Sequence, residues 1–217
     1  MERRNLTILC FSDFHAWAAE EIDRIKDFSY DICFLLGDIE RDALRYIKNT
    51  VKPGTPMYGV QGNHDDWDIF QKTAFEMAME SDEMSLENDI KDLNFSSISY
   101  KGYVFYGIGG ATRYKNGNSA MLTQNEYTDV LKKRGEFEGN VDVLISHDTM
   151  YKLFSKDDPA HIGVKGITKF IKNKRVKLNI CGHHHKNVHI RKHGCDIVCI
   201  YRCSLITLPD MTVENLF

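Results

Sequence analysis

Seven residues that carry oxygen or imidazole donors stand at the ends of short apolar runs. They are Asp13, His15, Asp38, Asn63, His147, His183 and His185. Carboxylate, amide and imidazole groups together suit manganese, iron, zinc or nickel, whereas calcium and magnesium prefer shells made of oxygen alone. Seven donors are too many for one tetrahedral zinc ion. The set therefore predicts two divalent metal ions that share a bridging carboxylate.

The spacing within two of these groups supports a common site. Asp13 and His15 are two positions apart, and so are His183 and His185. In extended backbone, residues two apart point to the same side, so each pair can reach one cluster. Glycine before a donor, as at Gly37, lets the chain turn sharply at the end of a strand.

The elements that must position these donors follow from the hydrophobic pattern. Apolar runs rich in β-branched and aromatic residues predict strands at 6–11, 32–36, 57–60, 141–145 and 178–181, and helices are expected at 20–26, 43–49, 125–134 and 167–172. Strands this apolar are buried on both faces, and their alternation with helices indicates an α/β fold. The carboxyl ends of such strands form the crevice where ligands bind, so the donors are expected to converge there.

Three further segments have patterns of their own. Residues 98–108 and 188–201 are each interrupted by a short polar turn that contains glycine, and they predict antiparallel hairpins. Residues 66–94 are acidic, with apolar residues at helical spacing, and predict an amphipathic helix and a connector.

The six cysteines are expected to be reduced and buried. They are Cys10, Cys33, Cys181, Cys195, Cys199 and Cys203. Free cysteine packs readily in apolar cores. The last three repeat every four residues, which lacks the Cys-x-x-Cys turn of zinc ribbons and on one strand would place them on one face.

Bulk composition narrows the class of protein. With 217 residues, of which 42% are hydrophobic, the chain is expected to form one domain over residues 1–217 with a sizeable core. No apolar run is long enough for a membrane span and no signal peptide is recognisable, so a cytoplasmic location is expected. A net charge of −3 argues against a global basic excess but leaves a local basic patch open.

Five short blocks occur in a characteristic order. They are Asp13-Phe14-His15, Gly37-Asp38, Gly62-Asn63-His64-Asp65, His147 and Gly182-His183-His184-His185. Each block alone is weak, but the five in this order resemble the signature of the calcineurin-like metallophosphoesterases, in particular their small phosphodiesterase-like branch. The resemblance implies two facing mixed β-sheets flanked by helices.

The resemblance also implies a set of ligands for each metal. One ion would be held by Asp13, His15, Asp38 and His185, and the other by Asp38, Asn63, His147 and His183. Asp38 would bridge the two ions. Manganese is the favoured metal, with iron, zinc and nickel as alternatives. In the family's mechanism a hydroxide that bridges the metals attacks phosphorus.

Roles for four further residues follow from the same resemblance. His64 would assist the leaving group, and Asp65 would orient His64. Arg113 and His161 are candidates for substrate contact, because they lie in segments similar to those of the small phosphodiesterase-like branch and a guanidinium matches phosphate geometry.

These assignments favour a phosphodiesterase, because the chain has no room for the large additional segments of protein phosphatases. A metal-dependent nuclease or a phosphomonoesterase is the alternative within the enzyme class, so nucleotides and nucleic acids are candidate substrates. A non-catalytic metal-binding module for protein interaction is the alternative outside it, but such a module is expected to have lost His64 or Asp65, and both are present. The sequence gives no indication of oligomeric state.

Overall fold

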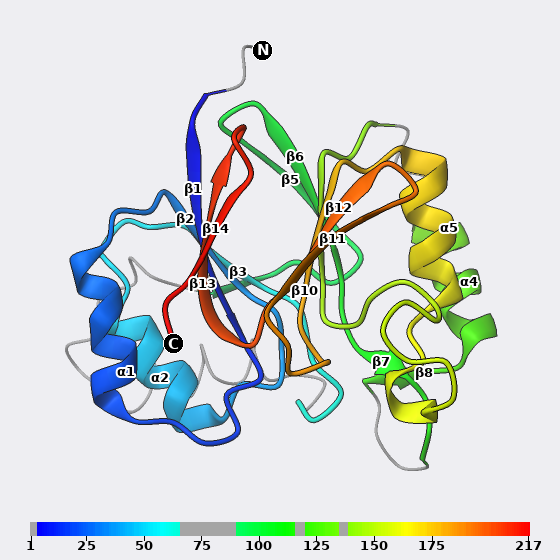
Figure 1. The fold of residues 1–217 in the computed structure, drawn as a ribbon, viewed down its shortest axis with the longest axis horizontal. Coiled ribbons are helices and arrows are strands. Elements are labelled where there is room, and N and C mark those ends of the chain that lie inside the picture. The colour runs from blue at the N-terminus through cyan, green and yellow to red at the C-terminus, as the bar shows by residue number, and fades with distance from the viewer. Residues whose placement is uncertain (1–3, 66–89, 116–119, 135–138) are drawn as a thin grey trace.

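The computed structural model describes residues 4–65, 90–115, 120–134 and 139–217. Within these ranges two six-stranded sheets face each other, with helices on their outer sides (Figure 1). Helices α1 (Ala19–Asp23) and α2 (Arg41–Thr50) lie on one side, and α4 (Gln124–Arg134) and α5 (Lys165–Lys174) lie on the other. The predicted α/β fold of two facing mixed sheets flanked by helices is confirmed.

The first sheet has the strand order β14-β13-β1-β2-β3-β4. Its strands are β1 (Leu6–Ser12), β2 (Ile32–Leu35), β3 (Met57–Gly59), β4 (Ile90–Asp92), β13 (Arg202–Leu208) and β14 (Thr212–Asn215). Strands β1 to β4 are parallel, whereas β13 is antiparallel to both β1 and β14. The carboxyl ends of β1, β2 and β3 therefore lie at one edge of the sheet.

The second sheet has the order β11-β12-β10-β9-β6-β5. Its strands are β5 (Ser97–Tyr100), β6 (Tyr103–Ile108), β9 (Val143–Ser146), β10 (Leu178–Cys181), β11 (Val188–Lys192) and β12 (Cys195–Cys199). The four central strands are parallel, and β5 and β11 pair antiparallel with the strands that follow them. A small third sheet joins β7 (Ala111–Thr112) and β8 (Met121–Leu122).

The hydrophobic core explains why the central strands are apolar throughout. In β1, Ile8 and Cys10 face the layer between the two sheets, whereas Leu9 and Phe11 face α1 and α2. A third cluster fills the space between the second sheet and α4 and α5. Both faces of each sheet are thus covered, and a buried strand has no polar side to alternate with.

Most predicted elements are found within two or three residues of their expected ends. Both predicted hairpins form, with positive φ angles at the turn residues Lys101, Gly102, His193 and Gly194. Strands β4, β7, β8, β13 and β14 had not been predicted. The expected helix in 66–94 lies almost entirely outside the described residues. No helix among those described is long and apolar enough to span a membrane.

All six cysteines are free and buried, as expected. The expectation that Cys195, Cys199 and Cys203 share one face of a strand is wrong. Cys195 and Cys199 begin and end β12, whereas Cys203 belongs to β13 in the other sheet. The chain leaves the second sheet at Ile200 and enters the first at Arg202, where φ is 69°.

Candidate metal centre

A first group of donors gathers where β1 ends. Ligand atoms of Asp13, His15 and His185 lie within 4.8 Å of one another. Asp13 Oδ1 is 3.4 Å from His185 Nε2, and the rings of His15 and His185 are 5.3 Å apart. Asp13 is buried, whereas both histidines are exposed. This group is therefore anchored in the core and open to solvent on its histidine side.

A second group is fully buried. Ligand atoms of Asp38, His147 and His183 also lie within 4.8 Å of one another. His147 Nε2 is 3.4 Å from Asp38 Oδ2 and 2.9 Å from Asn63 Oδ1, so the amide belongs to the same group. The structure thus brings all seven predicted donors into two groups. The division between the groups is the one expected for the two ligand sets, and Asp38, which was expected in both sets, lies in the second group.

Four residues of this centre have a strained backbone conformation. Asp13, Asp38, His183 and His185 have φ angles of 59°, 54°, 66° and 49°, in the left-handed region that residues other than glycine rarely adopt. All four follow the end of a strand, where the turn aims the side chain toward the opposite sheet. Such strain persists only where surrounding structure enforces it, and it concentrates at functional sites.

Backbone carbonyls fix the orientation of two histidine rings. Leu36 O lies 2.7 Å from Nδ1 of His147, and Ala160 O lies 2.8 Å from Nε2 of His183. Each ring donates that N–H to the carbonyl and turns its other nitrogen to the cluster. Metal-binding histidines are commonly held in this way, because the outer hydrogen bond sets the tautomer and the ring plane.

The donors fit divalent cations. Asp13 Oδ1 is buried and makes no hydrogen bond within the described part of the chain, and it lies 3.4 Å from His185 Nε2, so a cation bound by both groups would satisfy this oxygen. Burial lowers the pKa of His183 to about 4, so its ring is neutral at pH 7 and able to act as a ligand.

The charge around His147 points the same way. Burial would lower the pKa of its ring, but the carboxylate of Asp38, supported by Asp13, outweighs burial and raises the pKa to about 10. Burial likewise works against ionisation of Asp38, yet His147 holds the pKa of that carboxyl well below its usual range. At pH 7 the ring of His147 therefore carries a proton that faces Asp38, and a bound cation would take the place of that proton.

Close packing of glycine against a donor gives a testable consequence. A Cβ at Gly62 would lie 2.0 Å from Oδ1 and 2.3 Å from the backbone nitrogen of Asp38. Gly62→Ala is therefore expected to displace Asp38 and to weaken manganese binding at least tenfold, measured by calorimetry. Gly54→Ala is the control for backbone strain, because its φ of 77° also disfavours alanine but a Cβ there meets nothing within 4 Å and displaces no donor. Equal manganese affinity in both variants would contradict this account.

Comparison with known proteins identifies the family. Residues 6–201 match the sequence profile of the calcineurin-like phosphoesterase superfamily domain. The chain belongs to this superfamily. The chain is also 25% identical over 207 residues to the uncharacterized protein MJ1162 of Methanocaldococcus jannaschii, a match that covers 89% of this chain and 86% of the other.

Solved structures share the fold of this chain. The protein TT1561 of Thermus thermophilus matches with a TM-score of 0.72 and 14% identity over 99% of this chain and 100% of its own. A dimetal phosphatase from Danio rerio matches with a TM-score of 0.63 and 11% identity over 98% of this chain and 96% of its own. At these identities the likeness shows the arrangement of the sheets and helices.

His64 lies beside the first group of donors. Its ring is exposed and stands edge-on to that of His15, with centroids 5.6 Å apart, while its backbone N–H donates to Asp38 Oδ1 at 2.7 Å. Asp65 is buried, and its Oδ2 accepts hydrogen bonds from the backbone of Gly62 and Asp38 at 2.7 and 3.0 Å. Burial, followed by the charge of Asp38, raises the pKa of Asp65 to about 6.

The two candidates for substrate contact differ in their surroundings. Arg113 donates from Nε and Nη2 to Met121 O and lies 3.2 Å from Glu126, which ties it to β8 and α4. His161, in the 3₁₀ helix Pro159–His161, stacks near His183 with ring centroids 4.8 Å apart, and its Nδ1 lies 2.6 Å from Asp158 Oδ2. Substrate contact stays a prediction for both.

Two residues beside the centre had been given no role by the sequence. The buried Asp148 lies 3.3 Å from Nε2 of His184, which is buried as well, and it accepts a hydrogen bond from the backbone N–H of Thr149. Burial works against its ionisation, yet His184 keeps its pKa below the ordinary value. This pair joins the turn after β9 to the turn after β10. Its only sequence signal is adjacency to His147 and His183.

Proposed function

We propose that this protein hydrolyses phosphodiesters at a centre of two divalent cations, with manganese favoured. The observation that carries the proposal is the division of the donors into an open group at Asp13 and a buried group at Asp38. Two adjacent clusters of mixed oxygen and nitrogen donors suit two borderline cations. The family supports phosphoester hydrolysis in general, and the preference for diesters is our own.

Asp13, His15 and His185 would hold one cation, and Asn63, His147 and His183 the other, with Asp38 shared. When bound, the two cations would neutralise charge on the phosphoryl oxygens and lower the pKa of the attacking water. The carbonyls of Leu36 and Ala160 keep the rings of His147 and His183 in place for this task.

His64 would assist departure of the leaving group. Its exposed ring beside His15 can reach a substrate bound at the open group without occupying a ligand position. Asp65 would orient His64 through the backbone. Its carboxylate accepts hydrogen bonds from the backbone N–H groups of both Gly62 and Asp38, at the base of the loop that carries the His64 ring. His161, at the edge of the buried group, would face the bound ester.

A substrate panel tests the proposal. With manganese supplied, we expect turnover of bis-p-nitrophenyl phosphate to exceed that of p-nitrophenyl phosphate by about tenfold or more in kcat/KM. Cyclic nucleotides and single-stranded DNA, assayed next, separate a nucleotide diesterase from a nuclease. A preference for the monoester would replace the diesterase by a phosphomonoesterase.

Two further outcomes bear on the enzyme class. Two bound metals without hydrolysis of any ester would favour a non-catalytic metal-binding module that binds a protein partner. Absence of bound metal in the manganese-supplied protein would remove the basis of the proposal altogether. Metal analysis on the same samples distinguishes the two results.

A further inference from the structure

The segment from Lys165 to Lys177 concentrates positive charge. It contains six basic residues and no acidic one, in a chain whose net charge is −3. Lys165, Lys169 and Lys172 stand at positions i, i+4 and i+7 of α5, so they share one face of the helix. All three are exposed. This lysine face, defined by these three residues, is the local basic patch that composition had left open.

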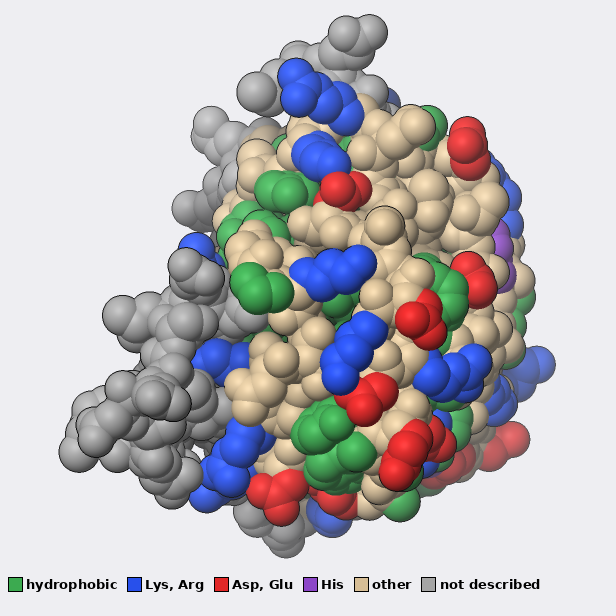
Figure 2. Space-filling model, turned by 90° about the vertical axis from the view of Figure 1, so that its left-hand side faces the viewer, with side chains coloured by type: hydrophobic (Ala, Val, Ile, Leu, Met, Phe, Trp, Pro, Cys, Tyr) green, Lys and Arg blue, Asp and Glu red, His purple; other side chains and the backbone are tan. Residues whose placement is uncertain are grey.

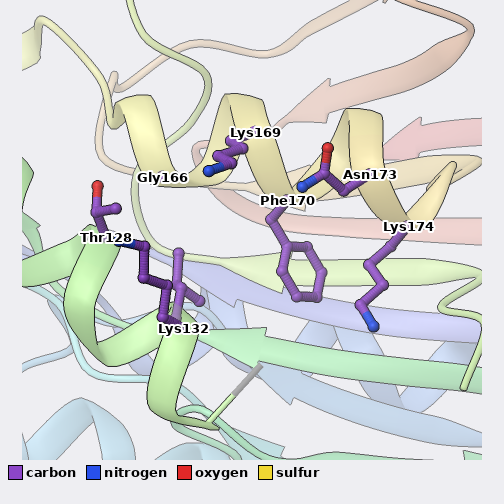
Figure 3. Close-up of a pocket in the computed structure, with 8 residues that line it drawn as sticks. Thr128, Lys132, Gly166, Lys169, Phe170, Asn173 and Lys174 are labelled. Carbon is purple, nitrogen blue, oxygen red and sulfur yellow. The ribbon is translucent and has the colours of Figure 1, made fainter. Parts of the chain in front are cut away.

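The lysine face borders two hollows in the surface. One, of about 330 Å³, is lined by Tyr151 together with all three lysines. The other, of about 210 Å³, lies between α4 and α5, where Lys132, Lys169 and Lys174 surround Phe170 (Figure 3). Lys169 lines both hollows. The positive charge of the lysine face therefore lies along two hollows, one of which contains the apolar side chain of Phe170.

Nothing within the described part of the chain neutralises the lysine face, because none of its three side chains forms an ion pair there. The side of the molecule formed by α1 and α2 is different, since cations and anions are interspersed on it (Figure 2). Lys26 lies 2.6 Å from Asp23 there, and Arg45 lies 3.9 Å from Asp42. The lysine face, whose three side chains form no ion pair with the described residues, thus differs from that side of the molecule.

The lysine face begins at the loop that borders the metal centre. The N–H of Tyr151 donates to Thr168 Oγ1 at 2.9 Å, and Lys165 Nζ lies 5.0 Å above the Tyr151 ring. The same loop supplies Ala160 O, which holds the ring of His183. One loop thus contacts both the metal centre, through Ala160, and the first lysine of the face, through Tyr151.

We infer that the lysine face is a docking surface for the phosphodiester backbone of a nucleic acid. Seven residues of helix extend about 10 Å, and along one strand of B-form DNA that distance holds about three phosphates. Three lysines over the same length match this charge density. The chemistry also matches the centre, because the bond proposed to be hydrolysed there repeats along the polymer. The inference concerns binding, so it can succeed or fail independently of the proposed hydrolysis.

Binding of an oligonucleotide tests the inference. The full-length protein with manganese is titrated into fluorescein-labelled phosphorothioate oligodeoxythymidine, which resists hydrolysis, and anisotropy is followed at several salt concentrations. The triple variant Lys165→Gln, Lys169→Gln, Lys172→Gln is expected to bind about tenfold more weakly, with a salt slope smaller by about 2. The matched control carries Lys26→Gln, Arg41→Gln and Lys52→Gln, and it is expected to bind as the wild type does.

Hydrolysis of bis-p-nitrophenyl phosphate serves as the internal reference. The lysine variant is expected to retain wild-type turnover of this small ester, which shows that it is folded and that its metal centre is intact. Equal loss of oligonucleotide binding in both triple variants would overturn the inference, and so would a wild-type protein that does not bind the oligonucleotide at low salt. Tighter binding to vesicles of anionic lipid than to the oligonucleotide would also overturn it, in favour of a membrane surface.

Discussion

Replacing Asp38 by asparagine is expected to abolish most of the hydrolytic activity. Its Oδ2 lies 3.4 Å from His147 Nε2 and its Oδ1 accepts the N–H of His64, so one side chain joins the buried group to the loop beside the open group. The amide keeps the shape of the side chain but removes the negative charge that two bound cations would share. A loss of about 4 kcal/mol of transition-state stabilisation corresponds to about a thousandfold lower kcat/KM.

Metal content distinguishes this explanation from simple misfolding. Asp38→Asn should bind fewer than two manganese ions per chain while its circular dichroism spectrum stays that of the wild type. Asp42→Asn is the matched control, because this carboxylate of α2 is 78% exposed and lies at the surface. Full metal content with normal turnover in Asp38→Asn would contradict the role proposed for Asp38.

The sequence predicts that the donors gather at one place, because the relevant information is local. Each donor follows an apolar run directly, and parallel strands bring their carboxyl ends to the same edge. The convergence of Asp13, on β1 of one sheet, with His185, after β10 of the other, depends only on the two sheets facing each other. The hairpin turns depend on local sequence as well. Each turn has a lysine or histidine followed by glycine, and the glycine adopts its positive φ without strain.

The unpredicted features depend on contacts far apart in the chain. Strand β13 contains Ser204 and Thr207 within its apolar sequence, which obscured its pattern, yet it pairs with β1 along the whole of that strand. The carbonyls of Leu36 and Ala160 belong to the backbone, so the residue types at these positions do not predict their hydrogen bonds to the histidine rings. The contacts of Arg113 with Met121 and Glu126 likewise depend on how β8 and α4 pack beside it.

Replacing His64 by glutamine is expected to lower kcat about 10²- to 10⁴-fold while both metals stay bound. The side chain is exposed and the loop is held by its backbone, since the His64 N–H donates to Asp38 and Asp65 fastens Gly62. Glutamine preserves these bonds and removes the ring. His193→Gln is the matched control, because His193 is an exposed histidine at the β11–β12 turn.

The dependence of activity on the leaving group distinguishes two roles for His64, that of a general acid and that of a residue that only supports the loop. A weakly basic leaving group such as p-nitrophenolate departs with little help, whereas an alkoxide needs a proton. If His64 supplies that proton, His64→Gln loses more activity on an alkyl ester than on the p-nitrophenyl ester, and the difference widens as the leaving group becomes more basic. A loss of equal size on both esters would mean that the ring positions the substrate or the loop, because misplacement slows departure of every leaving group alike.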